Sequence, residues 1–220
     1  MKSLIPTALC LALLAGLAGC NSKDTTAPTA SIGSQPYSAA ATSRFPTKPE
    51  VNLYPKVKVH TSAGEFVVKL DRKLAPLSVD NFLLYASTGQ YNGTIFHQVY
   101  DGFILLGGGY DTQFNLRPTE APVHNEAQNG LRNRRGTIAM ARQADAINSA
   151  TSQFFINLAD NTALDHLGDN DDQFGYCVFG EVVSGMDVIE QISKGKTHDT
   201  AQFEKVPLDP IVIESVQRMD

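Results

Sequence analysis

Residues that could carry metal or thiol chemistry are few in this sequence and widely separated. His124, His166 and His198 lack the short intervals that bring metal ligands together, so we expect no metal site. Cys177 is the only cysteine after residue 20, and it stands inside the apolar run YCVFGEVV. We interpret it as a small core residue, which leaves the domain to fold without an internal disulfide.

The overall charge argues against one further class of function. The chain of 220 residues has 42% hydrophobic residues and a formal net charge of -5, which suits one packed domain and gives no reason to expect nucleic acid. Four arginines nevertheless lie close together in sequence: Arg132, Arg134, Arg135 and Arg142. We interpret them as solvated loop charges, with a local basic patch as the alternative.

The elements that must position any site are mostly short strands. Alternating or continuous apolar patterns predict eight of them, at residues 54–61, 65–71, 94–100, 102–108, 136–142, 153–158, 176–183 and 210–217. Ala63-Gly64 is a plausible hairpin turn between the first two. Eight short strands with two helices fit a mainly β fold, a closed antiparallel barrel with helices over its open ends.

Helical spacing appears twice. Residues 75–90 place Val79, Phe82, Leu83 and Ala86 on one face, with Ser78 as the expected N-cap and Gly89 as the expected stop. The segment MDVIEQISKG predicts a second short helix that ends at Gly195.

The first 50 residues have a different composition. Residues 1–19 contain Lys2 and an apolar stretch, as a signal peptide does, and LAGC at residues 17–20 resembles the bacterial lipobox. We therefore expect lipidation of Cys20 and attachment to a membrane. A plain secretory signal or an uncleaved anchor are the alternatives.

Residues 20–50 are rich in Ser, Thr, Ala and Pro, which predicts a flexible linker before a folded domain at 51–220. These features place the protein in the bacterial cell envelope, facing the periplasm. Asn21 is not the aspartate associated with inner-membrane retention, so the outer membrane is weakly favoured.

Long ordered motifs identify a family for the folded domain. They are NFLLYASTGQYNGTIFH, GFILLGGG, NEAQNGLRNRRGTIAMAR, NSATSQFFINLADN and FGYCVFGEVVSGMDVIEQI. From about Lys56 to Asp220 the chain resembles a cyclophilin, most closely the bacterial periplasmic type. The resemblance implies an eight-stranded barrel that isomerises the peptide bond before proline and uses no cofactor.

The resemblance also assigns roles to individual residues. It implies that Phe103, Ile104, Phe155 and Leu164 line the proline pocket, that Gln153 bonds the substrate, and that the backbone at Ala141 and Arg142 pairs with the peptide. The alternatives are ordinary barrel core for the apolar residues and a surface amide for Gln153.

The chain departs from the family at several site positions. Where the family has Phe-His-Arg, this sequence has Phe96, His97 and Gln98, so the arginine that supplies the decisive hydrogen bond is absent. Leu106 replaces a glutamine, Ala163 replaces a bulky aromatic residue, and Tyr176 stands where many eukaryotic members have histidine.

These departures predict slower turnover. A neutral amide donor contributes about 1–2 kcal/mol less than a charged one, which corresponds to roughly 5- to 30-fold in rate. Arg142 is a possible substitute donor. His97 is expected to make a structural hydrogen bond, because twisting an amide requires no proton abstraction.

Three hypotheses follow. The favoured one is an envelope peptidyl-prolyl isomerase, attenuated by Gln98, that acts as a monomer on proline-containing peptides or unfolded exported proteins. The second is a non-catalytic module or chaperone that binds proline peptides on a cyclophilin scaffold. The third is a structural lipoprotein with a vestigial pocket.

Overall fold

The computed structural model describes residues 51–219. The predicted signal peptide (1–19), the predicted linker (20–50) and the lipidation site Cys20 lie outside the described residues, so these three predictions stand as made.

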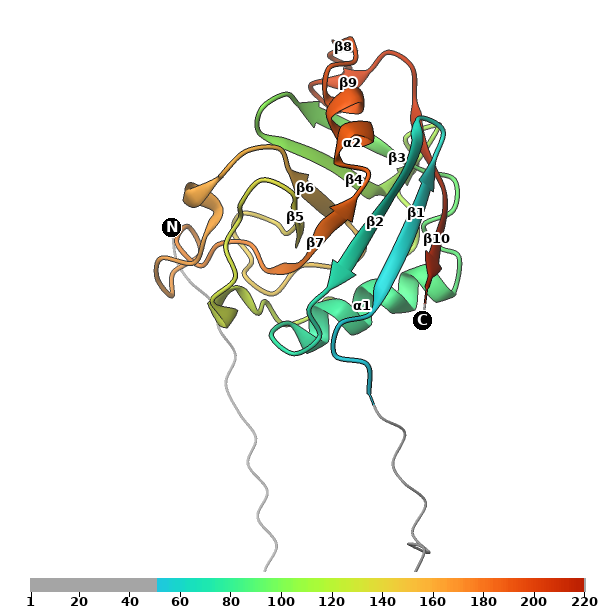
Figure 1. Ribbon diagram of the computed structural model, residues 1–220. Coiled ribbons are helices and arrows are strands. Elements are labelled where there is room, and N and C mark those ends of the chain that lie inside the picture. Colours follow the sequence, from blue (N-terminus) through green and yellow to red (C-terminus); the bar gives the residue numbers. More distant parts are fainter. Residues whose placement is uncertain (1–50, 220) are drawn as a thin grey trace, which may run out of the picture. The chain divides into compact units, whose positions relative to one another are not determined.

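The described residues form a closed barrel of eight antiparallel strands (Figure 1). The order around the barrel is β1-β10-β3-β4-β6-β5-β7-β2, and pairing of β2 with β1 closes it. The strands are β1 (Lys56–Thr61), β2 (Gly64–Leu70), β3 (Thr94–Tyr100), β4 (Ile104–Asp111), β5 (Thr137–Met140), β6 (Phe154–Asn157), β7 (Val178–Ser184) and β10 (Ile211–Arg218). All eight predicted strands are confirmed.

Helices cover the two ends of this barrel, as predicted. Helix α1 (Pro76–Ser87) lies across the lower end in Figure 1, and α2 (Met186–Ser193) lies at the upper end. Two short 3₁₀ helices also occur, η1 (Ala127–Asn129) and η2 (Thr162–Leu164). A small sheet of β8 (Thr197–His198) and β9 (Val206–Pro207) was not predicted, because two-residue strands show no periodicity.

Helix α1 begins differently from the prediction. Ser78 is not its N-cap, since the helix starts at Pro76 and Ser78 lies within the first turn. The free N–H groups of that turn are bonded by a distant carboxylate, with Leu77 and Ser78 donating to Glu126 over 3.0 and 2.8 Å. The end of the helix is as expected, since Gly89 has a φ of 71° directly after the C-cap residue.

The barrel interior is filled by the inward-facing residues of every strand and by α1. The predicted apolar face of α1 is buried, including Val79 and Phe82 at 0% exposure. Phe82 packs edge-on against Phe154 with ring centroids 5.5 Å apart. Cys177 is buried in this core, and burial raises the pKa of its thiol to about 12. It is therefore the inert core residue that the sequence predicts.

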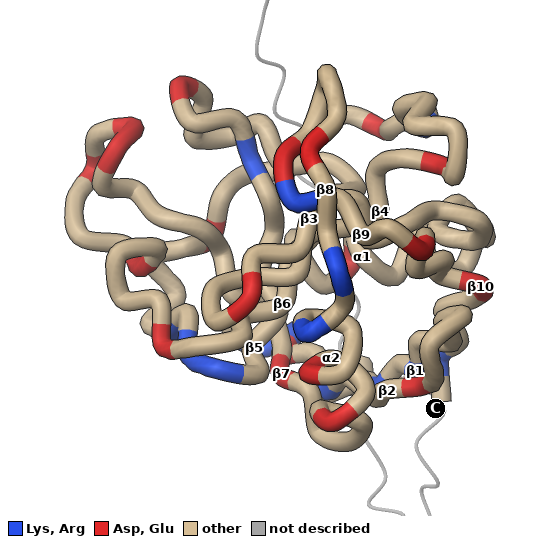
Figure 2. The backbone as a smooth tube through the Cα atoms, turned by 90° about the horizontal axis from the view of Figure 1, so that it is seen from above, with Lys and Arg blue, Asp and Glu red and all other residues tan. Residues whose placement is uncertain are grey.

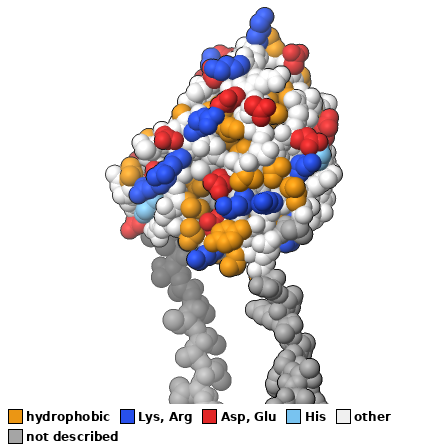
Figure 3. All heavy atoms as spheres, viewed as in Figure 1, with side chains coloured by type: hydrophobic (Ala, Val, Ile, Leu, Met, Phe, Trp, Pro, Cys, Tyr) orange, Lys and Arg blue, Asp and Glu red, His pale blue; other side chains and the backbone are white. Residues whose placement is uncertain are grey.

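Charged side chains are spread over the barrel surface. On the face formed by β1, β2 and β7, hydrophobic and charged side chains are interspersed (Figure 3), and ion pairs such as Lys69–Glu181 at 2.8 Å join neighbouring strands. Between residues 51 and 219 no helix has the length and apolar character needed to cross a membrane. The same part of the chain gathers no group of three or more His, Cys, Asp or Glu side chains suited to a metal ion.

Two of the clustered arginines near β5 pair with carboxylates, and acidic positions lie on the segments around them (Figure 2). Arg132 approaches Asp165 at 3.5 Å, and Arg135 pairs with Glu190. The side chain of Arg134 is exposed. The interpretation as surface loop charges fits Arg132, Arg134 and Arg135, whereas Arg142 is half-buried and its guanidinium bonds backbone carbonyls.

Candidate active site on the outer wall of the barrel

A row of five residues runs across neighbouring strands of the barrel wall. Gln98 is opposite Leu106, Leu106 is opposite Phe155, Phe155 is opposite Ala139, and Ala139 is opposite Val178. Directly opposed residues of a sheet point to the same face. The row therefore forms a mostly apolar strip with one polar end, at Gln98.

A β-bulge decides that Gln98 belongs to this row. Residues two apart in a regular strand share a face, yet Phe96 is buried in the core and Gln98 is half-buried on the outer wall. The register explains the difference, because Phe96 pairs with Gly107 and Gln98 with the adjacent Leu106, which leaves His97 as an extra residue. The bulge turns Gln98 outward beside the apolar strip.

The strip is the centre of a second apolar cluster, separate from the barrel core. Its buried members are Ala139, Phe155 and Val178, and the partly buried residues packed against them are Ile104, Leu106, Leu131, Ala141, Leu164 and Tyr176. Six of the residues assigned by the family resemblance thus lie in one cluster outside the core. Phe155 itself is 2% exposed, and its ring meets that of Tyr176 edge-on at 5.6 Å.

Two of the predicted pocket residues lie at the margin. Phe103 is 41% exposed, and its ring lies beside that of Tyr100 with centroids 6.5 Å apart. Ala163 is exposed beside Leu164 in η2 and contributes only a methyl group to that edge of the cluster. A groove of about 540 Å³ borders Tyr100 and Phe103 and leaves open space next to both.

A buried polar network fixes the two loops on either side of the cluster. Asn161 donates to the backbone carbonyl of Phe103 (2.9 Å) and to the side chain of Asn157 (2.7 Å). Asn157 donates in turn to Asn133 (3.2 Å), and Asn133 donates to the carbonyl of Leu164 (2.9 Å). Chain segments far apart in sequence are therefore held at a fixed separation across the site.

We expect Asn133→Ala to lower the free energy of unfolding by about 2 kcal/mol, because it leaves buried groups without partners. Asn133 is 2% exposed, and its backbone N–H and side chain both bond Asp165. Urea denaturation measures the change, and Asn170→Ala, at an exposed position, is the control. A loss below about 0.5 kcal/mol contradicts a role for the network.

Gln98 uses both of its amide hydrogens within the protein. Its Nε2 donates to the hydroxyl of Tyr100 at 2.8 Å and to the backbone carbonyl of Glu204 at 3.3 Å. The loop that carries Glu204 is anchored by Phe203, which packs on the ring of His97 at 5.2 Å. The neutral donor group is thus held at the polar end of the strip.

Arg142 commits four of its five guanidinium N–H groups to backbone carbonyls, so it is poorly placed to replace the missing arginine. Its guanidinium donates to the carbonyls of Gln143, Ala144, Asp171 and Gly175 at 2.6 to 3.0 Å. It also lies over the ring of Tyr176, 5.0 Å from the centroid. The structure therefore gives Arg142 a supporting role, in which it ties two loops together and holds Tyr176.

Gln153 stands between the apolar cluster and the glycine run of β4. The carbonyl of Gln153 accepts a hydrogen bond from Ala141 at 3.0 Å. Its side chain fills the space beside Gly109, where an added Cβ would lie 2.4 Å from Cγ of Gln153. Glycine is therefore required at this position for the glutamine side chain to lie here.

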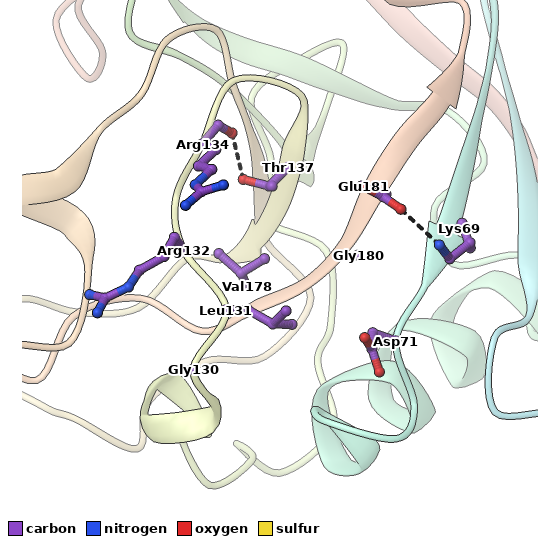
Figure 4. Close-up of a pocket in the computed structure, with 10 residues that line it drawn as sticks. All are labelled: Lys69, Asp71, Gly130, Leu131, Arg132, Arg134, Thr137, Val178, Gly180 and Glu181. Atoms are coloured by element: carbon purple, nitrogen blue, oxygen red, sulfur yellow. Dashed lines mark hydrogen bonds and ion pairs between the residues drawn. The ribbon is translucent and has the colours of Figure 1, made fainter.

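A pocket of about 340 Å³ adjoins the other end of the strip (Figure 4). Leu131 and Val178 line it and also belong to the apolar cluster. Charged residues of both signs line the rest: Lys69, Asp71, Arg132, Arg134 and Glu181. Because the charges are mixed, this pocket extends the apolar strip without selecting a ligand of one charge.

The comparisons with known proteins agree with this geometry. Residues 56–218 match the family model described as cyclophilin type peptidyl-prolyl cis-trans isomerase. The chain belongs to the cyclophilin family. It is 52% identical over 161 residues to peptidyl-prolyl cis-trans isomerase A of Dickeya dadantii (strain 3937), covering 73% of this chain and 83% of the relative.

Other cyclophilins are also similar to this chain in sequence or in structure. Peptidyl-prolyl cis-trans isomerase B of Escherichia coli (strain K12) is 47% identical over 160 residues, covering 73% of this chain and 97% of that protein. A crystal structure of a cyclophilin type peptidyl-prolyl cis-trans isomerase from Cryptosporidium parvum has a TM-score of 0.63 at 25% identity, covering 76% of this chain and 98% of that one. The cyclophilin fold and the isomerase class are thereby established.

Sequence reasoning missed four residues of this cyclophilin site. Ala139 and Val178 continue the row of Phe155, and Leu131 covers them, but only strand register reveals this. Tyr100 was missed as well. Its position two residues after Gln98 was the available signal, because such residues share a face beyond the bulge.

Proposed function

We propose that this protein is a peptidyl-prolyl cis-trans isomerase of the bacterial cell envelope whose turnover is reduced because Gln98 replaces the arginine of the family. The observation that carries the proposal is the position of Gln98 at the polar end of a strip formed by Leu106 and Phe155. This position supports the proposal, because a donor beside the apolar cluster could reach the nitrogen of a proline ring bound there.

The chemistry required of the site is a rotation, and no bond is made or broken. Rotation about the peptide bond has a barrier of about 18–20 kcal/mol because the planar amide loses its double-bond character. The apolar cluster around Phe155 holds the proline ring, and a hydrogen-bond donor near the prolyl nitrogen stabilises the twisted state. Proline-containing peptides and unfolded exported proteins are the substrates that fit this site.

The alternative is a cyclophilin that binds proline peptides without useful turnover. One observation favours it, since both amide hydrogens of Gln98 are already bonded to Tyr100 and Glu204. A substrate must break one of these bonds before Gln98 can donate to it. Retention of Phe103, Gln153 and Phe155 supports a working peptide site, because a structural lipoprotein with a vestigial pocket has no need of all three.

The cellular location is proposed from the leader sequence. LAGC at residues 17–20 supports lipidation of Cys20, and attachment at the periplasmic side of a membrane would place the domain among newly exported chains. Prolyl isomerisation without a catalyst takes about 10–100 s, so an isomerase at this location would speed the folding of exported proteins. Mass spectrometry of the mature protein tests this, because an unmodified Cys20 would contradict it.

We expect Gln98→Arg to raise kcat/KM for an Ala-Pro tetrapeptide by roughly 5- to 30-fold, because a charged donor replaces a neutral one. Cis-to-trans conversion followed by a protease-coupled assay measures the rate. Gln217→Arg adds the same charge at an exposed position of β10 and should leave the rate unchanged.

Each result has a distinct meaning. A weak wild-type rate that rises only with Gln98→Arg supports the attenuated isomerase. If neither protein exceeds the uncatalysed rate while the wild type still binds the peptide, the non-catalytic alternative is correct. If neither protein binds the peptide, both readings of the site are wrong.

A further inference from the structure

We propose that the phenol hydroxyl of Tyr100 is the group that donates to the twisting prolyl amide in this protein, in place of the absent arginine. The proposal rests on the isomerase activity proposed above and assigns its donor to a residue outside the sequence motif.

Tyr100 lies on the correct face and in the correct place. It follows Gln98 by two residues on β3, beyond the bulge, so both side chains point outward. The residue opposite Tyr100 on β4 is Ile104, a member of the apolar cluster. The ring is half-exposed, contacts Phe103 and lines the open groove beside it.

The hydrogen bonds leave one donor available. Gln98 donates one N–H group to the oxygen of Tyr100 and the other to the backbone carbonyl of Glu204. The oxygen of Tyr100 is therefore an acceptor, and among residues 51–219 no acceptor is found for its own proton. An O–H group whose oxygen accepts a hydrogen bond is polarised and becomes a better donor. Gln98 is thus a positioning residue, and Tyr100 presents the free proton.

The phenol keeps this proton at neutral pH. Burial raises the pKa of Tyr100 above its ordinary value of 10, and the nearby carboxylates of Glu204 and Asp199 raise it further. The hydroxyl remains neutral and protonated over the whole range in which the domain would work. The proton stays on Tyr100 throughout the rotation, because the phenol only donates a hydrogen bond and transfers no proton.

The timing of this bond predicts a kinetic signature. The nitrogen of a planar amide has its lone pair delocalised and accepts a hydrogen bond poorly, whereas the twisted amide regains a localised lone pair. A donor aimed at that nitrogen acts in the transition state and little in the ground state. Loss of the hydroxyl should therefore lower kcat and leave KM unchanged.

A double-mutant cycle on the full chain tests the assignment. We expect Tyr100→Phe, which keeps the ring and its contact with Phe103, to lower kcat by roughly 2- to 10-fold, the worth of one neutral hydrogen bond. In the Gln98→Arg background the same substitution should change kcat little, because the arginine supplies the donor. Tyr54→Phe removes a hydroxyl from an exposed ring away from the cluster and should have no effect.

The outcomes separate this proposal from the one on which it rests. Wild-type kcat in Tyr100→Phe, with a rate that still rises in Gln98→Arg, overturns the role of Tyr100 and leaves the isomerase proposal standing. An equal loss in both backgrounds also overturns it, because the hydroxyl would then act independently of the donor. A wild-type protein no faster than the uncatalysed reaction overturns both proposals.

Discussion

Acidification from pH 6.5 to pH 4 should remove about 3 kcal/mol of folding stability through His97 alone. Burial lowers the pKa of His97 from 6.5 to about 4. Above pH 6.5 the imidazole is neutral in both the folded and unfolded chains, and its contribution is complete. Between 6.5 and 4 the unfolded chain binds a proton that the folded chain does not, so stability falls as the pH falls.

The surroundings of His97 explain why the folded protein resists its protonation. The side chain is 1% exposed and packs between the rings of Tyr110 and Phe203, with centroid distances of 4.8 and 5.2 Å. Its Nδ1 is buried without a hydrogen-bond partner in the described part of the chain. No carboxylate lies in ion-pair contact with the ring there to compensate a positive charge.

Urea denaturation of the wild type and of His97→Phe at pH 7, 5.5 and 4 measures this effect. The phenylalanine keeps an aromatic ring between Tyr110 and Phe203 and removes the titrating group, so the variant should lose about 3 kcal/mol less than the wild type on acidification. His198→Phe, at an exposed position of β8, should retain the full loss. Equal losses in the wild type and His97→Phe would mean that another group controls acid stability.

Phe155→Ala should reduce kcat/KM by more than about 100-fold, since it removes the centre of the apolar cluster on which the proline ring would lie. Phe155 contacts the outer cluster from three sides, through Leu106 and Ala139 on the neighbouring strands and through the ring of Tyr176. We also expect a loss of about 3 kcal/mol in stability, typical of a buried phenylalanine truncated to alanine. Chemical denaturation and the peptide assay measure the two effects separately.

The adjacent phenylalanine provides a matched control. Phe154 points into the barrel and is 0% exposed, whereas Phe155 points to the outer wall. Phe154→Leu should lower stability while the folded protein keeps its kcat/KM, and Phe155→Leu should lower kcat/KM at a smaller cost in stability. The prediction fails if both leucine variants lose activity in proportion to stability, because Phe155 would then be ordinary structural core.

The local patterns of the sequence were sufficient to predict the eight barrel strands and the two α-helices. Strand alternation depends on side chains a few residues apart, and it places Phe154 and Phe155 on opposite faces of β6. The cyclophilin resemblance assigned Ile104, Leu106, Phe155 and Leu164 to one site, and the structure places these four residues in one apolar cluster. The start of α1 was wrong because Glu126, remote in sequence, replaces the expected Ser78 cap.

The sequence by itself determined the barrel strands, the apolar face of α1 and the absence of arginine at residue 98, because these depend on residue type and local spacing. Only the tertiary structure decided which donor groups are free at the site. The bulge at His97 turns Gln98 outward, and contacts between distant segments occupy its amide and the guanidinium of Arg142. Hydrogen bonds between remote segments leave no periodic signal in a sequence. The bond from Gln98 to the hydroxyl of Tyr100, and the role proposed for that hydroxyl, could therefore be identified only in the folded structure.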